Sequence, residues 1–458
     1  MKKITFAICL MACIVLVQSC KLGHKYVAPC VELPAVFTHE PADSVSLAEL
    51  DWWELYGDTI LQSLIHKALD NNKDLLMSDK RIDELAALNR VSKADLFPSV
   101  DGHIYVQKEG LNYGGDSYAN DPENGFKLRV SWELDLWGNL RWANDRSRAQ
   151  MLAEVENMRG LRISLIASVA QAYFELVALD NEYAIAKQTL AARSESVRIA
   201  RLRFEGGLTS ETPYRQAEVE YANTATYIPQ LERNIALKEN QISLLLGEYP
   251  TAIPRSKFNS EIHLPEALPV GLPSDLLERR PDIRQAEQQL IAANADMGVA
   301  YTNRFPRLAL TATGGFESDE FRNFFNSPMH FLSASILGPV FDMGTRQSQY
   351  RAKQAAYERQ VISYEKAVLT AFNDVREAII TFRKVQEIYE AWLRLEQAAK
   401  SNIDLARLQY INGVIGYIDL LDAQRSYFDA QIGLSNATRN KQLSLVTLYK
   451  ALGGGWQQ

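Results

Sequence analysis

The second half of the chain repeats the first at a spacing of about 206 residues, and this duplication limits the possible folds more than any other feature. Four positions recur 206 residues later: Gly138 as Gly344, Gly207 as Gly413, Ala217 as Ala423, and Gly247 as Gly453. Nearer the start of each copy the spacing is 208, as Phe97-Pro98 and Phe305-Pro306 show. Solenoids repeat roughly every 20–50 residues. The spacing therefore predicts two copies of one large unit.

Each copy contains the same predicted elements in the same order. The first copy has a helix at 59–69 after the cap Asp58, a break at 71–72, a helix ending before Pro98, strands, a long helix at 139–205, a glycine turn at 206–207 and a last helix at 214–246. The second has a helix at 275–279 after the cap Ser274, a break at 280–281, a helix ending before Pro306, strands, a long helix at 345–412, a turn at 413–416 and a last helix at 417–452. Proline ends a helix because the residue before it avoids the helical conformation.

The long helical segments are too long for a globular core. Residues 345–412 contain no glycine or proline, and residues 139–205 contain only Gly160. At 1.5 Å per residue, such a helix reaches about 100 Å. Two shorter helices of each copy, stacked end to end, nearly match that length, which predicts a bundle with two unbroken and two broken rods. An ordinary long coiled coil would explain the rods but not the sequence between them.

The sequence between the rods alternates as strands do. From Phe126 to Leu136 every second residue is apolar, and the residues between them are polar: Lys127, Arg129, Ser131, Glu133 and Asp135. Strict alternation over eleven residues indicates a half-buried strand, of a length that suits a tilted strand in a bilayer. Three shorter strands are predicted at 100–107, 308–313 and 332–336, with turn-rich loops at 108–125 and 317–329. The fold class is therefore mainly α with a small β part.

Two interpretations of the four strands remain open. A soluble hairpin pair packed on a helix bundle would satisfy the pattern. A membrane barrel would also satisfy it, but a barrel needs about eight or more strands and tolerates no open edge in lipid. Two chains would supply about 8 strands and three about 12, and the sequence arithmetic does not choose between them. In a barrel, Lys127, Arg129, Glu133 and Asp135 would face the lumen.

The N-terminus has the pattern of an export signal. Lys2 and Lys3 precede an apolar run from Ile4 to Val17, which is short for a membrane helix. The run ends at Leu16-Val17-Gln18-Ser19-Cys20, which resembles a bacterial lipobox. That resemblance implies that Cys20 becomes the acylated mature N-terminus. The alternative is a plain cleaved signal with an incidental cysteine.

Several classes of function find no support in the sequence. The chain is acidic, with a net charge of −7, so nucleic-acid binding is not expected. After processing only Cys30 remains as a free thiol, and no later segment has the length and apolarity of a membrane helix. The six histidines are scattered, and neither a phosphate-binding loop nor a nucleophile elbow is present. We therefore expect no enzyme activity, no metal and no cofactor.

The chain resembles the TolC-like outer-membrane factors of tripartite efflux pumps, in particular their OprM-like lipoprotein branch. Six segments carry the resemblance in order along the chain: Tyr26-Val27-Ala28-Pro29, Trp52-Trp53-Glu54-Leu55-Tyr56-Gly57-Asp58, Ser131-Trp132-Glu133-Leu134-Asp135-Leu136-Trp137-Gly138, Gly271 to Ile283, Leu421-Asp422-Ala423-Gln424-Arg425, and Leu448 to Trp456. Each segment is modest evidence alone, whereas their joint order over about 430 residues is highly specific.

The resemblance implies a homotrimer with a 12-stranded β-barrel in the outer membrane of a Gram-negative bacterium. It implies a passive duct, with a periplasmic adaptor (membrane fusion protein) and an inner-membrane transporter of RND type as partners. It divides the chain into a signal peptide (1–19), a lipidated N-terminal segment (20–57), helices of the first copy (58–98), its membrane hairpin (99–137), its long periplasmic helices and equatorial linker (138–270), helices of the second copy (271–306), its membrane hairpin (307–343), and its long helices with the C-terminal tail (344–458).

The two glycine turns between long helices would form the periplasmic tips. Glycine there serves the chain reversal, and in similar proteins the tips also bind the adaptor, which implies contacts from Gly207, Leu208, Ser210, Gly413 and Val414. The OprM-like branch has an acidic residue after the Gly-Val of the second tip, where this chain has Ile415. A constriction could then form from an apolar ring at Ile415, with Asp419 and Asp422 further along. Those carboxylates could instead be solvated or cap the helix.

A non-conducting, lipid-anchored coiled-coil protein is the competing hypothesis. It accounts for the signal and the rods. The alternating eleven-residue strand and the duplication favour the channel. A passive duct would leave the selection of the exported compounds to its transporter.

Overall fold

The computed structural model describes residues 21–30, 34, 57–111, 114, 119–258 and 275–454. Cys20, the Trp52-Trp53 segment and the predicted cap Ser274 lie outside the described residues. The chain divides into two compact units. The first, the sheet unit, comprises the described residues within 1–31, 80–156 and 284–366, and the second, the helical unit, comprises those within 32–79, 157–283 and 367–458.

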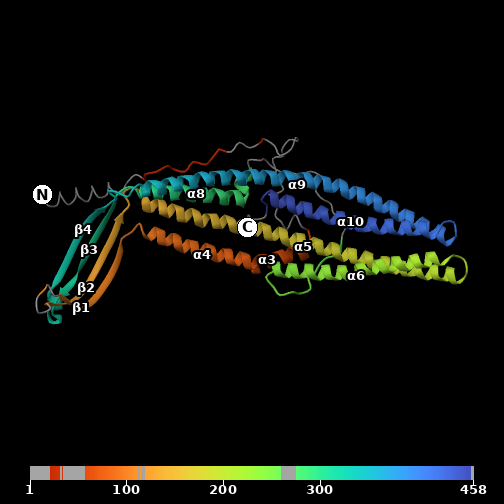
Figure 1. Cartoon of the computed structure of the whole chain (residues 1–458), viewed down its shortest axis with the longest axis horizontal. Helices are drawn as coiled ribbons and strands as arrows, with labels where there is room; N and C mark the ends of the chain where they lie inside the picture. The colour runs from red at the N-terminus through yellow and green to blue at the C-terminus, as the bar shows by residue number, and fades with distance from the viewer. Residues whose placement is uncertain are drawn as a thin grey trace. The chain divides into compact units, whose positions relative to one another are not determined.

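The sheet unit contains one antiparallel sheet of four strands in the order β1-β2-β3-β4 (Figure 1). The strands are β1 (Ser99–Leu111), β2 (Ala119–Leu134), β3 (Arg307–Ser318) and β4 (Pro328–Leu337). All four predicted strands exist, but they are longer than expected. Residues 119–125, predicted as loop, extend β2, and β2 ends at Leu134 instead of Leu136.

The register of the sheet places apolar side chains on one face. Val100 pairs with Val130, Val130 with Ala312, and Ala312 with Leu332. Residues two apart on each strand share that face, since side chains alternate. The apolar face therefore runs across all four strands, and it is open to solvent in the single chain: Leu332 is 82% exposed and Ile104 is 77% exposed.

Eight α-helices occur among the described residues, in the duplicated order that the sequence predicts. They are α3 (Thr59–Asn71), α4 (Lys73–Ala94), α5 (Asn139–Glu205), α6 (Glu211–Leu245), α7 (Asp275–Arg279), α8 (Pro281–Thr302), α9 (Thr345–Ile411) and α10 (Tyr417–Ala451). The helices α5 and α9 are each unbroken over 67 residues. Helix α6 begins three residues before the predicted start, at Glu211.

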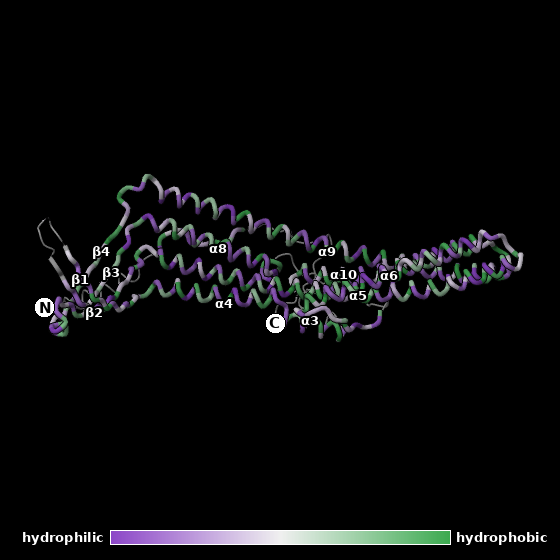
Figure 2. The backbone as a smooth tube through the Cα atoms, turned by 60° about the horizontal axis from the view of Figure 1, so that its bottom comes forward, coloured by the Kyte–Doolittle hydropathy of each residue, from purple (hydrophilic) through white to green (hydrophobic). Residues whose placement is uncertain are grey.

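The expectation that no later segment has the length and apolarity of a membrane helix is wrong. Helix α5 contains an 18-residue window with a mean hydropathy of 1.4, which is long and apolar enough to cross a membrane by composition alone. Most of that window, 61%, is buried among other helices, as in the core helix of a folded domain. The buried residues of α5 include Ile166, Val169, Ala170 and Leu176, and small side chains such as Ala170 let neighbouring helices approach closely. Figure 2 shows green, hydrophobic stretches alternating with purple ones along the helices, as expected for amphipathic packing.

Helix α3 begins at a cap that also contacts other parts of the helical unit. The side chain of Asp58 accepts hydrogen bonds from the backbone N–H of Ile60 and Leu61. Its second oxygen accepts from the hydroxyls of Tyr173 and Ser256. Burial alone would raise the pKa of Asp58, but these hydrogen bonds outweigh it and hold the pKa below its usual value. The predicted cap is therefore confirmed and is a charged group at neutral pH.

Candidate functional site

The two tip turns, 206–210 and 412–416, have the same backbone geometry in both copies. Gly207 and Gly413 have φ of 70° and 73°, a conformation that favours glycine. The N–H of Leu208 donates to the carbonyl of Arg203 at 2.8 Å, and the N–H of Val414 donates to that of Gln409 at 2.9 Å. These six-residue bonds close each helix as a Schellman motif. The side chains that follow the glycines, Leu208 and Val414, are 73% and 69% exposed.

Behind the turns, the ends of all four long helices pack into one apolar cluster, which we call the tip cluster. Tyr410 and Tyr417 form its aromatic centre, with ring centroids 5.8 Å apart. Burial raises the pKa of Tyr417 to about 12, so its hydroxyl stays protonated. The buried members are Ala200, Ala217, Ala406, Tyr410, Tyr417, Leu420, Leu421 and Ala423. Arg203 adds a polar bond, because its guanidinium donates to the carbonyl of Tyr410 at 3.1 Å.

The predicted constriction residues have identifiable neighbours in the single chain. Ile415 is partly buried against the tip cluster. The carboxylate of Asp419 accepts the N–H of Gly416 at 3.0 Å, so it caps α10. Asp422 is exposed and lies 4.0 Å from the guanidinium of Arg425. A pore-narrowing role for the three residues stays a prediction.

A buried charge cluster joining α5, α6 and α10 escaped the sequence analysis. Glu220 of α6, only 4% exposed, forms ion pairs with Arg193 at 2.9 Å and with Arg425. Arg193 also donates to the hydroxyl of Thr224 at 2.6 Å. Only Arg425 falls in a segment that the sequence analysis singled out. Pairing between distant helices leaves no local pattern in the sequence, so the roles of Glu220, Arg193 and Thr224 could not be predicted from it.

The polar face of the sheet carries three of the four predicted lumen residues. Lys127 lies 2.7 Å from Glu317 of β3 and 3.8 Å from Glu123 of its own strand. Glu133 lies 3.9 Å from Arg307, and Arg129 is opposite Asp101 and Thr313 in the register. These residues form a charged surface on the side opposite the apolar face.

The prediction for Asp135 is wrong, because β2 has already ended at Leu134. The carboxylate of Asp135 accepts the backbone N–H groups of Leu140 and Arg141, both at 3.0 Å, and pairs with the Arg141 side chain at 3.0 Å. Asp135 therefore stabilises the start of α5, where the free N–H groups of a helix favour a negative charge. Alternation alone could not locate the end of the strand.

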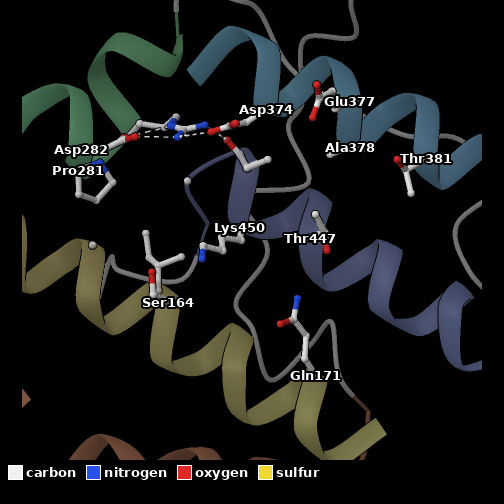
Figure 3. Close-up of a pocket in the computed structure, with 15 residues that line it drawn as sticks. Ser164, Gln171, Pro281, Asp282, Asp374, Glu377, Ala378, Thr381, Thr447 and Lys450 are labelled. Carbon is white, nitrogen blue, oxygen red and sulfur yellow. Dashed lines mark hydrogen bonds and ion pairs between the residues drawn. The ribbon is translucent and has the colours of Figure 1, made fainter. Parts of the chain in front are cut away.

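At the break between α7 and α8, Arg280 borders the cavity drawn in Figure 3, which has a volume of about 490 Å³. All five N–H donors of the Arg280 guanidinium are used. They bind Asp282 twice, at 3.0 and 2.7 Å, and Asp374 at 2.9 Å. They also reach the carbonyls of Ala371 and Ala451, at 3.2 and 3.1 Å. Burial alone would lower the pKa of Arg280, but the two carboxylates raise it, so the residue acts as a permanently charged joint.

Nothing in the described residues suggests a metal centre, since no three His, Cys, Asp or Glu side chains gather there. The proposed lipid site, Cys20, lies outside them. What the described geometry offers is a set of surfaces: an apolar sheet face, a charged sheet face and two exposed tips. Such surfaces are characteristic of channel-forming membrane proteins.

Comparison with known proteins identifies the family to which the chain belongs. The family model described as outer membrane efflux protein matches residues 64–248 and matches again at 272–454. The chain belongs to this family, and the double match confirms the duplication. The cation efflux system protein CusC of Escherichia coli is 31% identical over 445 residues, which cover 96% of each chain. The outer membrane protein OprJ of Pseudomonas aeruginosa is 32% identical, over 100% of this chain and 98% of its own.

Solved structures agree with this assignment. The outer-membrane channel OprN is 29% identical and superposes with a TM-score of 0.90, over 96% of this chain and 100% of its own. The open state of the MtrE outer membrane channel of Neisseria gonorrhoeae is also 29% identical, with a TM-score of 0.86 over 95% and 99%. The protein is thus an outer-membrane component of an efflux system, and its relatives are channel proteins and not enzymes.

Proposed function

We propose that three copies of the chain close a 12-stranded barrel and form a passive exit duct through the outer membrane. The observation that carries this proposal is the four-stranded sheet with an exposed apolar face and two unpaired outer strands, β1 and β4. Four strands are too few to close a barrel, and open strand edges are not tolerated in lipid. Pairing β4 of one chain with β1 of the next removes every edge. The family resemblance favours three copies over two.

In this assembly the apolar face meets lipid and the charged face lines water. Lys127, Arg129 and Glu133 would then line the lumen, with Lys127 held by its carboxylate neighbours. A wide, charged passage binds its cargo weakly and performs no chemistry. We infer that the protein has no enzyme activity and uses no cofactor or metal.

Conductance tests the duct directly. Purified protein added to a planar bilayer should produce stepwise ion currents, and outer-membrane fractions should contain heat-modifiable trimers. Val130→Asp, on the apolar face, should abolish insertion because a charge on the lipid face is costly. Arg129→Asp, its neighbour on the charged face, should still insert and should change ion selectivity. Trimers without conductance would favour the non-conducting coiled-coil alternative.

The tips are proposed to bind a periplasmic adaptor that links the channel to an RND-type transporter in the inner membrane. The contacts would come from Gly207, Leu208, Ser210, Gly413 and Val414, since Leu208 and Val414 leave apolar side chains in water. Leu208→Glu and Val414→Glu should lower efflux-dependent resistance while trimers still form. Tyr249→Glu, at a residue 91% exposed and remote in sequence from either tip, is the matched control. Unchanged resistance in both tip variants would contradict the proposal.

The N-terminus is proposed to be anchored through acyl chains on Cys20. One multiply acylated cysteine gives stable membrane attachment. Cys20→Ser should abolish incorporation of labelled fatty acid, whereas Cys30→Ser should leave it unchanged. Labelling that survives in Cys20→Ser would refute the anchor.

A further inference from the structure

The connection between β3 and β4 is a short 3₁₀ helix, η2 (Phe321–Asn326), with three phenylalanines in six residues. Phe321 and Phe325 are each 78% exposed. A free loop in water would not favour two exposed phenyl rings only four residues apart. The connection therefore has apolar side chains where turns are normally polar, and an apolar environment around η2 would explain them.

The aromatic rings of η2 continue the apolar face of the sheet. Phe316 of β3 lies on that face, because it pairs with Phe126 and follows Gly314, Ala312 and Leu310 at two-residue intervals. Its ring centroid lies 5.8 Å from that of Phe325 and 6.1 Å from that of Phe324. Phe321 stacks on Phe324 at 6.1 Å. The helix is thus folded over the apolar side of the sheet and not over the charged side.

The position of η2 along the strands fixes its depth. Helix α8 leads into β3, and β4 leads into α9, so η2 lies at the end of the sheet opposite to these helices (Figure 1). With those helices on the periplasmic side, η2 reaches the outer leaflet of the membrane.

The helix η2 also carries a basic residue, Arg322, directly after Phe321. Arg322 is exposed, and among the described residues no carboxylate pairs with it. The neighbouring polar groups are satisfied within the turn, since the Asn323 amide donates to Glu320 at 3.0 Å and the Ser327 hydroxyl donates to the carbonyl of Asn323 at 3.2 Å. Guanidinium groups bind phosphate well, and aromatic rings are common where acyl chains meet headgroups.

We propose that η2 is a lipid anchor in the outer leaflet, with Phe321 and Phe325 in the acyl-chain boundary and Arg322 on a lipid phosphate. This inference rests on the proposed barrel, because it requires the apolar face to meet lipid. It adds an interaction surface at the far end of the sheet and assigns that surface a partner, an anionic lipid headgroup. The anchor would fix the height and tilt of the barrel independently of Cys20.

Spin labels on single cysteines test the anchor in the assembled full-length protein, with Cys30→Ser as background. The protein is reconstituted in vesicles of phosphatidylethanolamine and phosphatidylglycerol. Labels at Phe325→Cys and Val130→Cys should be accessible to oxygen, which dissolves in lipid, and inaccessible to a water-soluble nickel chelate. A label at Arg129→Cys should be accessible to the nickel chelate and less accessible to oxygen. A nickel-accessible Phe325→Cys beside an oxygen-accessible Val130→Cys would overturn the anchor and leave the barrel standing. A nickel-accessible Val130→Cys would overturn the barrel itself.

The phosphate contact has its own test. Adding Arg322→Gln should lower the ratio of oxygen to nickel accessibility at Phe325→Cys about fivefold, on the scale of one lost contact between a basic residue and an anionic surface. The same substitution should not change the ratio at Val130→Cys. An unchanged ratio at Phe325→Cys would show that Arg322 does not hold the helix to a headgroup.

Discussion

In each copy of the duplicated unit, the break between two short helices lies at the end of the last long helix, and we call this contact the joint. The two copies use different side chains to hold it. In the first copy the Asn72 amide donates to the carbonyl of Leu245, the last residue of α6, at 3.0 Å. In the second copy the Arg280 guanidinium donates to the carbonyl of Ala451, the last residue of α10, at 3.1 Å. Both side chains satisfy a carbonyl that a helix end leaves free. The backbone arrangement is the shared feature, and the chemistry differs.

The difference lies in how many helices each joint connects. Asn72 also caps α4, accepting the N–H of Asp74 and Leu75. Arg280 has more donors and ties in the unbroken helix α9 through Asp374 and Ala371. A neutral amide is therefore enough to stack two helices, whereas the cation binds the stack to its neighbour.

The largest expected effect is the loss of the charged joint. Arg280→Ala leaves two carboxylates and two carbonyls without their donor, which should destabilise the helical unit by about 3 kcal/mol. Arg280→Lys should recover only part of this, since it cannot make five bonds. The midpoint of thermal unfolding in detergent measures both. Arg198→Ala, which removes an exposed pair with Glu195, is the control and should change little. Equal midpoints for Arg280→Ala and the control would show that the joint is redundant.

For the glycines at the two joints, we expect the opposite order: substitution in the first copy, at Gly247, should destabilise the protein more than substitution in the second copy, at Gly453. A Cβ on Gly247 would lie 2.3 Å from the carbonyl oxygen of Asn71, whereas a Cβ on Gly453 would lie 3.2 Å from that of Arg279. Both glycines have positive φ, so alanine costs about 1–2 kcal/mol at either position. Gly247→Ala should cost more, about 2–3 kcal/mol in all, because backbone must also shift. Similar unfolding midpoints for the two variants would mean that the first joint is looser than its geometry indicates.

Removal of the neutral joint should cost less than removal of the charged one. Asn72→Ala loses the cap of α4 and the bond to Leu245, which should lower stability by about 1–2 kcal/mol. Asn72→Asp keeps the acceptor for the cap and loses the donor, so it separates the two contributions. If Asn72→Asp unfolds at the midpoint of Asn72→Ala, the bond across the joint accounts for the whole effect.

The smallest expected effect is a pH dependence confined to the first copy. The pKa of Asp58 is lowered in the folded state, so its contribution is complete above the ordinary carboxyl pKa and is lost as the pH falls through the folded value. The predicted counterpart, Ser274, does not titrate. Thermal unfolding midpoints measured from pH 6 down to about pH 3 should fall less in Asp58→Asn than in the unaltered protein. Parallel curves would assign the acid sensitivity to other groups.

Features with a local cause were predictable from the sequence. Helix α5 spans the predicted residues, Asn139–Glu205, because Gly138 and Gly206 mark its two ends and the segment between them contains no proline and a single glycine, Gly160. The strands were found because alternation is also local. The exposed tips followed from glycines that a helix reversal requires.

Features that depend on a distant partner were not predictable. Residues 119–125 look like a turn but belong to β2, because β1 supplies their hydrogen bonds. Gly125 fits there since the ring of Tyr105 occupies the space that a side chain would need, with a Cβ only 2.3 Å from it. The pairing of Glu220 with Arg193 and Arg425 likewise needs three helices in place. Asp135 was misassigned because a strand end is set by the helix cap that follows it.

The unequal edges of the sheet have a genetic consequence. Strand β1 has 13 residues and β4 has 10, so in the proposed trimer each contact joins unlike edges, head to tail. A subunit with a damaged β4 still presents an intact β1 and can enter a growing ring that it then prevents from closing. Such an allele, expressed beside the normal gene, should be dominant because mixed assemblies that contain the damaged subunit cannot close. Deletion of one of two gene copies should be recessive.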